Sequence, residues 1–156
     1  MPRVRFILAG GLLLAACSRK FDSQALGLVW TPPAGVRLIS ESAGPPPRAT
    51  FEGGVAWYVI PGLSTSLEES TLQATLQSVA DAARASIRGK ISSAKVGSIL
   101  VGSVIRYELS AEDGRTLAYV IPRFGDTVLL VLTSDGPAYG RTSANLEMSL
   151  STLRWK

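Results

Sequence analysis

The sequence predicts an α+β domain, and three observations carry this prediction. A capped apolar stripe with helical spacing extends from Ser66 to Gly89, which is typical of an amphipathic helix. Segments with the two-residue alternation of strands follow one another between Ile99 and Thr133, with turn signals between them. Asp135-Gly136-Pro137 then gives the start signal of a closing helix,. This order indicates a mixed fold in which helices pack on a sheet.

Residues 1–16 have the composition of a signal peptide. Arg3 and Arg5 precede an apolar run from Phe6 to Ala16, which is the order of the basic and apolar regions of a secretory signal. The run has about half of the roughly 20 apolar residues that a membrane-spanning helix needs. We therefore expect this leader to be removed, and the fold to be formed without it.

The leader closes with Leu14, Ala15, Ala16 and Cys17, and Cys17 is the only cysteine of the chain. This order resembles the lipobox of bacterial lipoprotein signals. The resemblance implies that Leu14, Ala15 and Ala16 are read by the processing machinery and that the Cys17 sulfur receives diacylglycerol. Acylation of the new amino terminus would make the anchoring stable, because one acyl chain alone binds a membrane only marginally. The alternative is an ordinary signal peptide followed by a chance cysteine.

A lipid on Cys17 places the protein in the cell envelope. We expect residues 17–27 to form a lipidated tether and residues 28–156 to form a single globular domain. Ten fully stretched residues reach about 33–36 Å, so the domain is expected close to the membrane. In the lipoproteins that the signal resembles, serine in the place of Ser18 permits export to the outer membrane. In a host with two membranes, the expected location is the outer membrane, facing the periplasm.

The composition excludes most common kinds of active site. The chain has no histidine, which excludes Ser-His-Asp triads and most zinc or iron sites. Acylation of Cys17 leaves no thiol for a disulfide, a metal or a nucleophile. Loss of Arg3 and Arg5 with the leader lowers the basic residues from 16 to 14 against 12 acidic ones, a net charge of +2. We therefore expect no binding of nucleic acid, and no glycine-rich phosphate loop suggests a cofactor.

Short strands are expected before the long helix. Leu28-Val29-Trp30 and the segment from Val36 to Ser40 are extended in character, and the prolines of Gly44-Pro45-Pro46-Pro47 end any regular element after them,. Thr50 to Ile60 is expected to be one strand, with a bend or bulge at Gly53-Gly54,. Its second half is apolar on both alternate faces, which is typical of a strand buried on both sides.

The long helix is predicted from Ser66 to Gly89. Ser66 and Glu69 have the spacing of a capping box, and Gly89 is a natural residue for the C-terminal cap,. The apolar residues recur at spacings of three and four, which gives one stripe suited to packing on a sheet. Its members are Leu72, Leu76, Val79, Ala80, Ala83 and Ile87.

Three strands are predicted from Ile99 onward. In the first, Arg106 and Glu108 alternate with Tyr107 and its apolar neighbours, so one face is expected to be largely wet,. Turns are expected at Glu112-Asp113-Gly114-Arg115 and at Gly125-Asp126, the latter as a type II′ hairpin with Gly125 in its first central position. The apolar run Val128 to Leu132 suits a central strand covered on both faces,.

The last segment is predicted to be a helix that begins near Pro137. Leu146, Leu150 and Leu153 repeat on one side of it,. Trp155 follows the helix, and two roles are open for it: docking back onto the sheet, or an exposed contact for a partner.

This order of elements resembles the Mog1/PsbP-like fold, which includes small envelope lipoproteins. The matching pieces are the strand from Val55 to Pro61, the helix from Ser66 to Gly89, the meander from Ile99 to Thr133 and the end from Ser149 to Arg154. The resemblance implies an antiparallel sheet sandwiched between the long helix and the C-terminal helix. It also implies an accessory or assembly role, since members of the family mostly have such roles, and it assigns no catalytic residues.

Two sets of residues could support catalysis without histidine. A lysine can serve as base for a serine, but Ser92, Ser93 and Lys95 are expected in an ordinary polar connection. Paired carboxylates are the second route. The four candidates fall on a strand, in turns and before a helix, and no spacing brings two together: Glu108, Asp113, Asp126 and Asp135. We therefore predict no catalytic, cofactor-binding or metal-binding residues.

The function predicted from the sequence is that of a membrane-anchored envelope lipoprotein without catalytic activity. It would act as an accessory, assembly or interaction protein through contacts with an unidentified envelope protein, and would reach the membrane through the lipid on Cys17. The alternative is a lipoprotein that binds a small ligand or a lipid in a pocket between helix and sheet. A hydrolase with an unrecognised site is the third hypothesis.

Overall fold

The computed structural model describes residues 19–156, so Leu14, Ala15, Ala16, Cys17 and Ser18 lie outside the described residues. Within them, no helix is long and apolar enough to cross a membrane. The elements in chain order are β1 (Phe21–Ser23), β2 (Leu28–Trp30), β3 (Leu38–Ser42), β4 (Arg48–Phe51), η1 (Glu52–Gly54), β5 (Val55–Pro61), η2 (Glu69–Thr71), α1 (Leu72–Ala83), β6 (Lys90–Ile99), β7 (Gly102–Ala111), β8 (Gly114–Arg123), β9 (Asp126–Ser134), α2 (Gly136–Ser149), η3 (Leu150–Thr152) and β10 (Arg154–Trp155).

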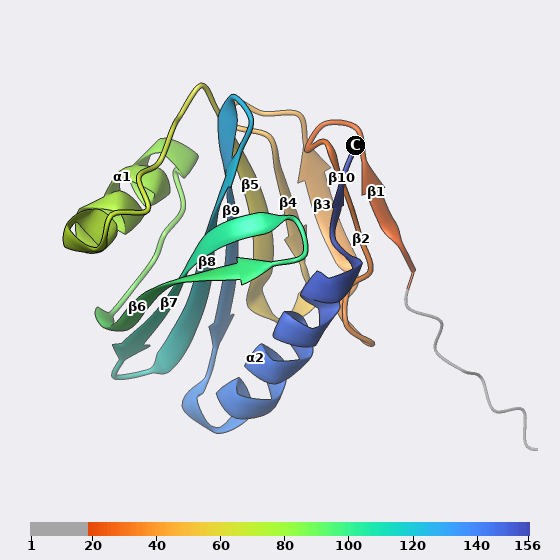
Figure 1. Ribbon diagram of the computed structural model, residues 1–156. Helices are drawn as coiled ribbons and strands as arrows, with labels where there is room; N and C mark the ends of the chain where they lie inside the picture. Colours follow the sequence, from red (N-terminus) through yellow and green to blue (C-terminus); the bar gives the residue numbers. More distant parts are fainter. Residues whose placement is uncertain (1–18) are drawn as a thin grey trace, which may run out of the picture.

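Two antiparallel sheets and two helices form a sandwich (Figure 1). The large sheet has seven strands in the order β3-β4-β5-β9-β8-β7-β6, and the small sheet has the order β1-β2-β10. Helix α1 packs on one face of the large sheet, whereas α2 and the small sheet cover the other. This arrangement confirms the predicted α+β fold, with an antiparallel sheet between the long helix and the C-terminal helix.

Strands β8 and β9 form the centre of the core. Leu129 and Val131 point towards α1, and the alternate residues Leu130 and Leu132 point towards α2 and the small sheet. All four are buried, as expected for a continuous apolar run covered on both faces,. The prediction that Val128 to Leu132 is a central strand is therefore confirmed.

The segment from Thr50 to Ile60 is a hairpin, and the prediction of one bent strand is wrong. β4 and β5 pair side by side, with Phe51 opposite Val55, and η1 reverses the chain between them. Gly53 and Gly54 both have φ of +77°, a conformation that residues with a side chain adopt at a cost,. Two glycines with positive φ reverse the chain direction here, where a bulge would only have bent it.

The long helix is shorter than predicted, and the prediction of a capping box at Ser66 and Glu69 is wrong. The hydroxyl of Ser66 accepts a hydrogen bond from the backbone N–H of Glu68 at 3.1 Å, and α1 begins only at Leu72, after a 3-10 turn. The helix ends at Ala83, and its C-terminal cap is Arg84, in the left-handed conformation with φ of 54°. The prediction of Gly89 as the cap is therefore wrong. Ile87 packs on the same apolar cluster from the extended chain that follows. An apolar spacing alone does not distinguish these two ways of reaching the core.

Strand β6 was missed because it lacks an apolar face. The residues expected in a polar connection, Ser92, Ser93 and Lys95, lie in β6, at the edge of the large sheet next to β7. Most of the strand is exposed, so no alternation of apolar and polar residues marks it,.

The folded chain begins before residue 28, the boundary expected from the sequence. Phe21–Ser23 pairs with β2, and Phe21 and Leu26 are buried. At the other end of the chain, β10 pairs with β2 on its second side, and the Lys156 ammonium lies 2.6 Å from an Asp22 carboxylate oxygen. The two ends of the described chain therefore belong to one small sheet.

We expect the two glycines of η1 to differ in their tolerance of a side chain. A Cβ at Gly54 would overlap the carbonyl oxygen of Thr133, whereas nothing lies within 4 Å of a Cβ at Gly53. Gly53→Ala should lower the free energy of unfolding by about 1 kcal/mol, the cost of the left-handed backbone. Gly54→Ala should lower it by on the order of 3 kcal/mol or more. Urea unfolding of both variants checks this; equal losses would contradict the close packing of η1 on β9.

Candidate functional site

The turn between β8 and β9 displays an aromatic side chain. Arg123 pairs with Asp126, so the two central residues are Phe124 and Gly125, and Gly125 takes a φ of +81°. Gly125 is therefore the second central residue, and the predicted type II′ turn with Gly125 in first place is wrong. As first central residue Phe124 extends from the tip, where its side chain is fully exposed (104%). Such loops usually carry glycine, asparagine or aspartate; a phenylalanine there is the sequence signal that was missed.

Arg123 makes the base of this turn rigid. Its guanidinium donates two hydrogen bonds of 2.7 Å to the carboxylate of Asp126, and a further one of 2.8 Å to the carbonyl of Leu26. Bidentate pairs of this kind are among the strongest side-chain interactions. The guanidinium also lies 4.9 Å from the ring centroid of Trp155, a cation–π distance. Asp126, one of the candidate carboxylates, is thus a partner of arginine in the structure.

A hollow of about 440 Å³ lies beside this arginine. Val101, Phe124 and Trp155 contribute apolar surface to it, and we call these three residues with Arg123 the aromatic patch. Trp155 is half-buried, and its backbone pairs with Leu28 in the small sheet. It therefore docks back onto the fold, which was one of its two predicted roles. Its side chain still lines the hollow. Aromatic residues and arginine are the side chains most enriched at the centres of protein interfaces.

A network of polar side chains lies between the large sheet and α2. Arg106 on β7 pairs with Glu108 on the same strand, at 3.4 Å, and with Glu147 on α2. The Tyr119 hydroxyl donates to Glu147 at 2.6 Å, and the Tyr139 hydroxyl donates to Glu108 at 2.7 Å. The face of β7 that was predicted to be largely wet is thus partly covered by α2. Sequence spacing gave no sign that Glu147, far along the chain, would meet Arg106.

The network keeps the Glu108 carboxylate ionised. The hydrogen bond from Tyr139 lowers the pKa of Glu108 below its ordinary value of 4.5, and Arg106 lowers it further against the effect of burial. A general acid needs a raised pKa, so Glu108 does not fit that role. Burial and the hydrogen bond to Glu108 raise the pKa of Tyr139. The guanidinium of Arg115 lies 4.3 Å from the Tyr139 ring centroid. These contacts fix α2 on the sheet.

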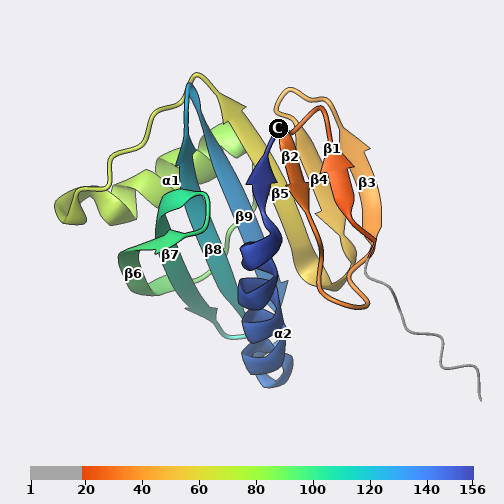
Figure 2. The same cartoon turned by 45° about the vertical axis from the view of Figure 1, so that its right-hand side comes forward.

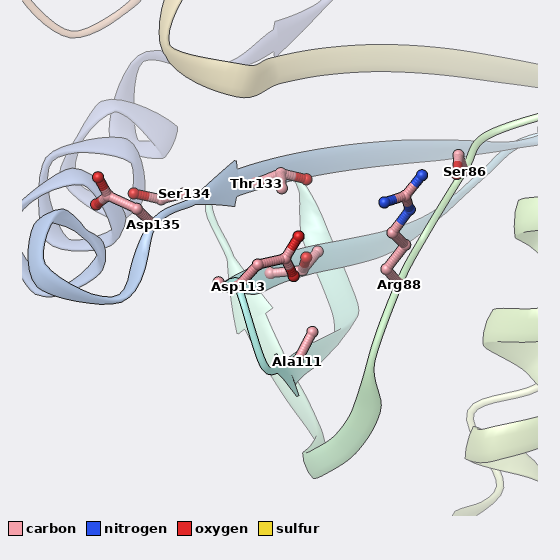
Figure 3. Close-up of a pocket in the computed structure, with 9 residues that line it drawn as sticks. Ser86, Arg88, Ala111, Asp113, Thr133, Ser134 and Asp135 are labelled. Carbon is pink, nitrogen blue, oxygen red and sulfur yellow. The ribbon is translucent and has the colours of Figure 1, made fainter.

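A polar cleft of about 300 Å³ lies where β8 begins and β9 ends, next to the first turn of α2 (Figure 3). Arg88, from the chain before β6, and Asp113, from the β7–β8 turn, project into it from opposite sides. Asp135 also lines it, but its carboxylate accepts a hydrogen bond of 2.9 Å from the backbone N–H of Ala138, as the cap of α2. Asp113 and Asp135 thus have the turn and cap positions expected from the sequence.

The remaining candidates stay apart within residues 19–156. Ser92 donates to the backbone carbonyl of Glu108 at 3.1 Å, and no hydrogen bond joins Lys95 to either neighbouring serine in this part of the chain. No group of three or more acidic or thiol side chains in it is placed to hold a metal ion. The hollow between α1 and the sheet measures about 130 Å³, which is below the roughly 300–1,000 Å³ of ordinary ligand sites.

The whole fold is similar to that of a solved protein, cyanobacterial PsbP (CyanoP) from Synechocystis sp. PCC 6803. The two structures align with a TM-score of 0.59 and 14% sequence identity, over 94% of this chain and 96% of that chain. At this identity the likeness concerns the fold, and it confirms the predicted PsbP-like architecture. No protein-family model matches the sequence, and none of the curated proteins matches it either.

We expect Tyr139→Phe to raise the pKa of Glu108 towards 4.5, because the variant loses the hydrogen bond that lowers it most. In the wild type, the unfolded chain binds the proton at higher pH than the folded chain. Stability is therefore lost as the pH falls below about 4.5, and the variant should lose less of it. At neutral pH the variant should be less stable by about 1–2 kcal/mol.

Carboxyl NMR titration and acid unfolding measure these two effects. Tyr58→Phe is the matched control, because Tyr58 packs against the apolar side chains between α1 and the opposite face of the large sheet. This variant should leave the pKa of Glu108 unchanged. An unchanged Glu108 pKa in Tyr139→Phe would contradict the network.

Proposed function

We propose that the protein is a cell-envelope lipoprotein, anchored by lipid on Cys17, that acts through protein contacts as a non-catalytic accessory or assembly protein. In a host with two membranes it would face the periplasm from the outer membrane. The observation that carries the proposed role is the aromatic patch. In it, Phe124 is fully exposed beside a hollow, and Arg123, which lines this hollow, is held in place by its hydrogen bonds to Asp126. A surface of this kind loses little conformational freedom when a partner binds.

The position of the first strand supports close anchoring. β1 begins at Phe21, four residues after Cys17. Four residues span at most about 14 Å, which is much less than the tether of ten residues expected from the sequence. A lipid on Cys17 would thus hold the folded domain at the membrane surface.

The placement of the aromatic patch supports access by a partner. The β8–β9 turn lies at the upper rim of the large sheet, whereas the β2–β3 loop, residues 31–37, lies at the lower end of the small one (Figure 2). Arg123 contacts the chain just before β2, through the carbonyls of Leu26 and Gly27. The patch and the β2–β3 loop are therefore at opposite ends of β2, so a membrane near one leaves the other open.

The polar surfaces of residues 19–156 support a non-catalytic role. Glu108 is held ionised by donors from two elements, and Asp126 is held by Arg123. An ionised Glu108 does not fit the role of a general acid, and both carboxylate oxygens of Asp126 accept hydrogen bonds from Arg123,. The cleft between Arg88 and Asp113 is the place where a small polar ligand would find room, and it is the reason to keep ligand binding as the second candidate function.

For the anchor, we expect Cys17→Ala to abolish incorporation of radioactive fatty acid and to leave the precursor uncleaved. Ser18→Ala, a change beside the processing site, should keep the label. Both variants are compared with the wild type after metabolic labelling of cells. Equal labelling of Cys17→Ala and wild type would sink the lipoprotein hypothesis.

For the partner surface, a photo-crosslinking amino acid at position 124 should give a discrete adduct with one envelope protein in intact cells. The same probe at Met148, an exposed apolar residue of α2 (68%), is the control and should give much less. Phe124→Ser should weaken binding of the partner so identified by about 30-fold, the loss expected at an interface hot spot. Equal adducts from both positions would show that Phe124 has no special role.

A further inference from the structure

A second hollow lies beside the first described residues of the chain. It measures about 670 Å³, which is within the range of small-ligand sites. One side is formed by residues 19–21 and the other by residues 32–38, the β2–β3 loop with the start of β3. Phe51, from β4, contributes to its apolar wall. We call this hollow the basic groove.

The charged residues that line the basic groove are all cations. Arg19, Lys20 and Arg37 line it, and its lining contains no acidic residue. In residues 19–156 none of these three cations has an ion-pair partner, whereas Asp22, the acidic neighbour along the chain, is paired with Lys156. Unpaired cations around a hollow attract an anion. The anions at a membrane surface are phospholipid headgroups.

The wall of the basic groove is apolar and fixed. Phe21 and Phe51 are buried and pack edge to face, with ring centroids 5.0 Å apart. The β2–β3 loop is tied by a hydrogen bond of 3.0 Å from Val36 to the carbonyl of Pro33. A second, of 2.8 Å, runs from Glu52 to the carbonyl of Arg37. A ligand with a charged head and an apolar tail would therefore find cationic side chains for its head and an apolar wall for its tail, in a site that is already formed before binding.

Exposed apolar side chains continue this surface onto the sheet edge. Leu38 and Ile39 follow Arg37 on the edge strand β3, with 46% and 66% of their surface exposed. Basic residues beside exposed aliphatic ones are typical of surfaces that lie in the interface of a membrane.

The position along the chain selects the occupant. Arg19 is two residues from Cys17, a span of at most about 7 Å. We propose that the basic groove binds the headgroup and upper acyl chain of an anionic phospholipid of the membrane that anchors the protein. This step rests on the proposed lipidation of Cys17. It deepens the proposed function, because a bound lipid sets the orientation of the domain and keeps the aromatic patch away from the bilayer.

The test is an NMR titration of the full-length protein, expressed in a lipoprotein-processing bacterium and extracted in a neutral detergent. Dihexanoyl phosphatidylglycerol, dihexanoyl phosphatidylcholine and inorganic phosphate are added separately. We expect the anionic lipid to shift the backbone amides of residues 19–21 and 34–38, with little effect from the other two. Removal of each cation should weaken binding about fivefold, so that the double variant Lys20→Gln/Arg37→Gln binds about 25-fold more weakly.

Arg141→Gln, which changes an exposed arginine of α2, is the matched control and should bind like the wild type. Equal binding of the two lipids, equal binding of phosphate alone, or an unaffected double variant would each overturn the basic groove as a site for an anionic phospholipid. The mass of the N-terminal peptide of the same sample reports lipidation of Cys17 separately. A groove that binds the anionic lipid in a chain with an unmodified Cys17 would overturn the anchor and leave the groove standing.

Discussion

The structure depends on one strand pair that is buried on both faces. β8 and β9 carry apolar side chains in both alternate positions, and almost all of them are inaccessible to solvent. Such a pair is stable only when other elements cover each face. Helix α1 provides one cover, and α2 with the small sheet provides the other (Figure 1). The large sheet is therefore the middle layer of a sandwich, with β3 and β6 left at its edges.

Polar contacts fix the covering elements in place. Arg123, at the end of β8, holds the carbonyls of Leu26 and Gly27, and so ties the central pair to the small sheet. Arg106 and its partners tie β7 to α2. Because β10 and β1 both pair with β2, the last residues of the chain stabilise the first ones that the structure describes. The described fold thus begins four residues after Cys17, so the proposed lipid anchor at that residue would directly limit how the domain is oriented on a membrane.

The sequence predicted those elements that have a periodic apolar face or a clear cap. The central strand at Val128 to Leu132 and the start of α2 at Asp135 are of this kind. It did not predict β6, which is mostly exposed and whose sequence shows no alternation of apolar and polar residues. The candidate site was missed for a different reason: the role of Phe124 depends on the register of the β8–β9 pair, and a shift of one residue in a two-residue turn changes which side chain is at the tip,. Long-range polar pairs leave no trace in local spacing.

The proposed role assigns a different task to each end of β2. The groove beside residues 19–21 would face the anionic membrane, and the aromatic patch would face a partner. The proposed anchoring, from which the domain takes its place at the membrane, requires that the sulfur of Cys17 be bound to lipid. Cys17 is the only cysteine, so a count of free thiols in the purified, fully denatured protein tests this requirement most directly. A lipidated chain should show almost no free thiol; one free thiol per chain would contradict the anchor.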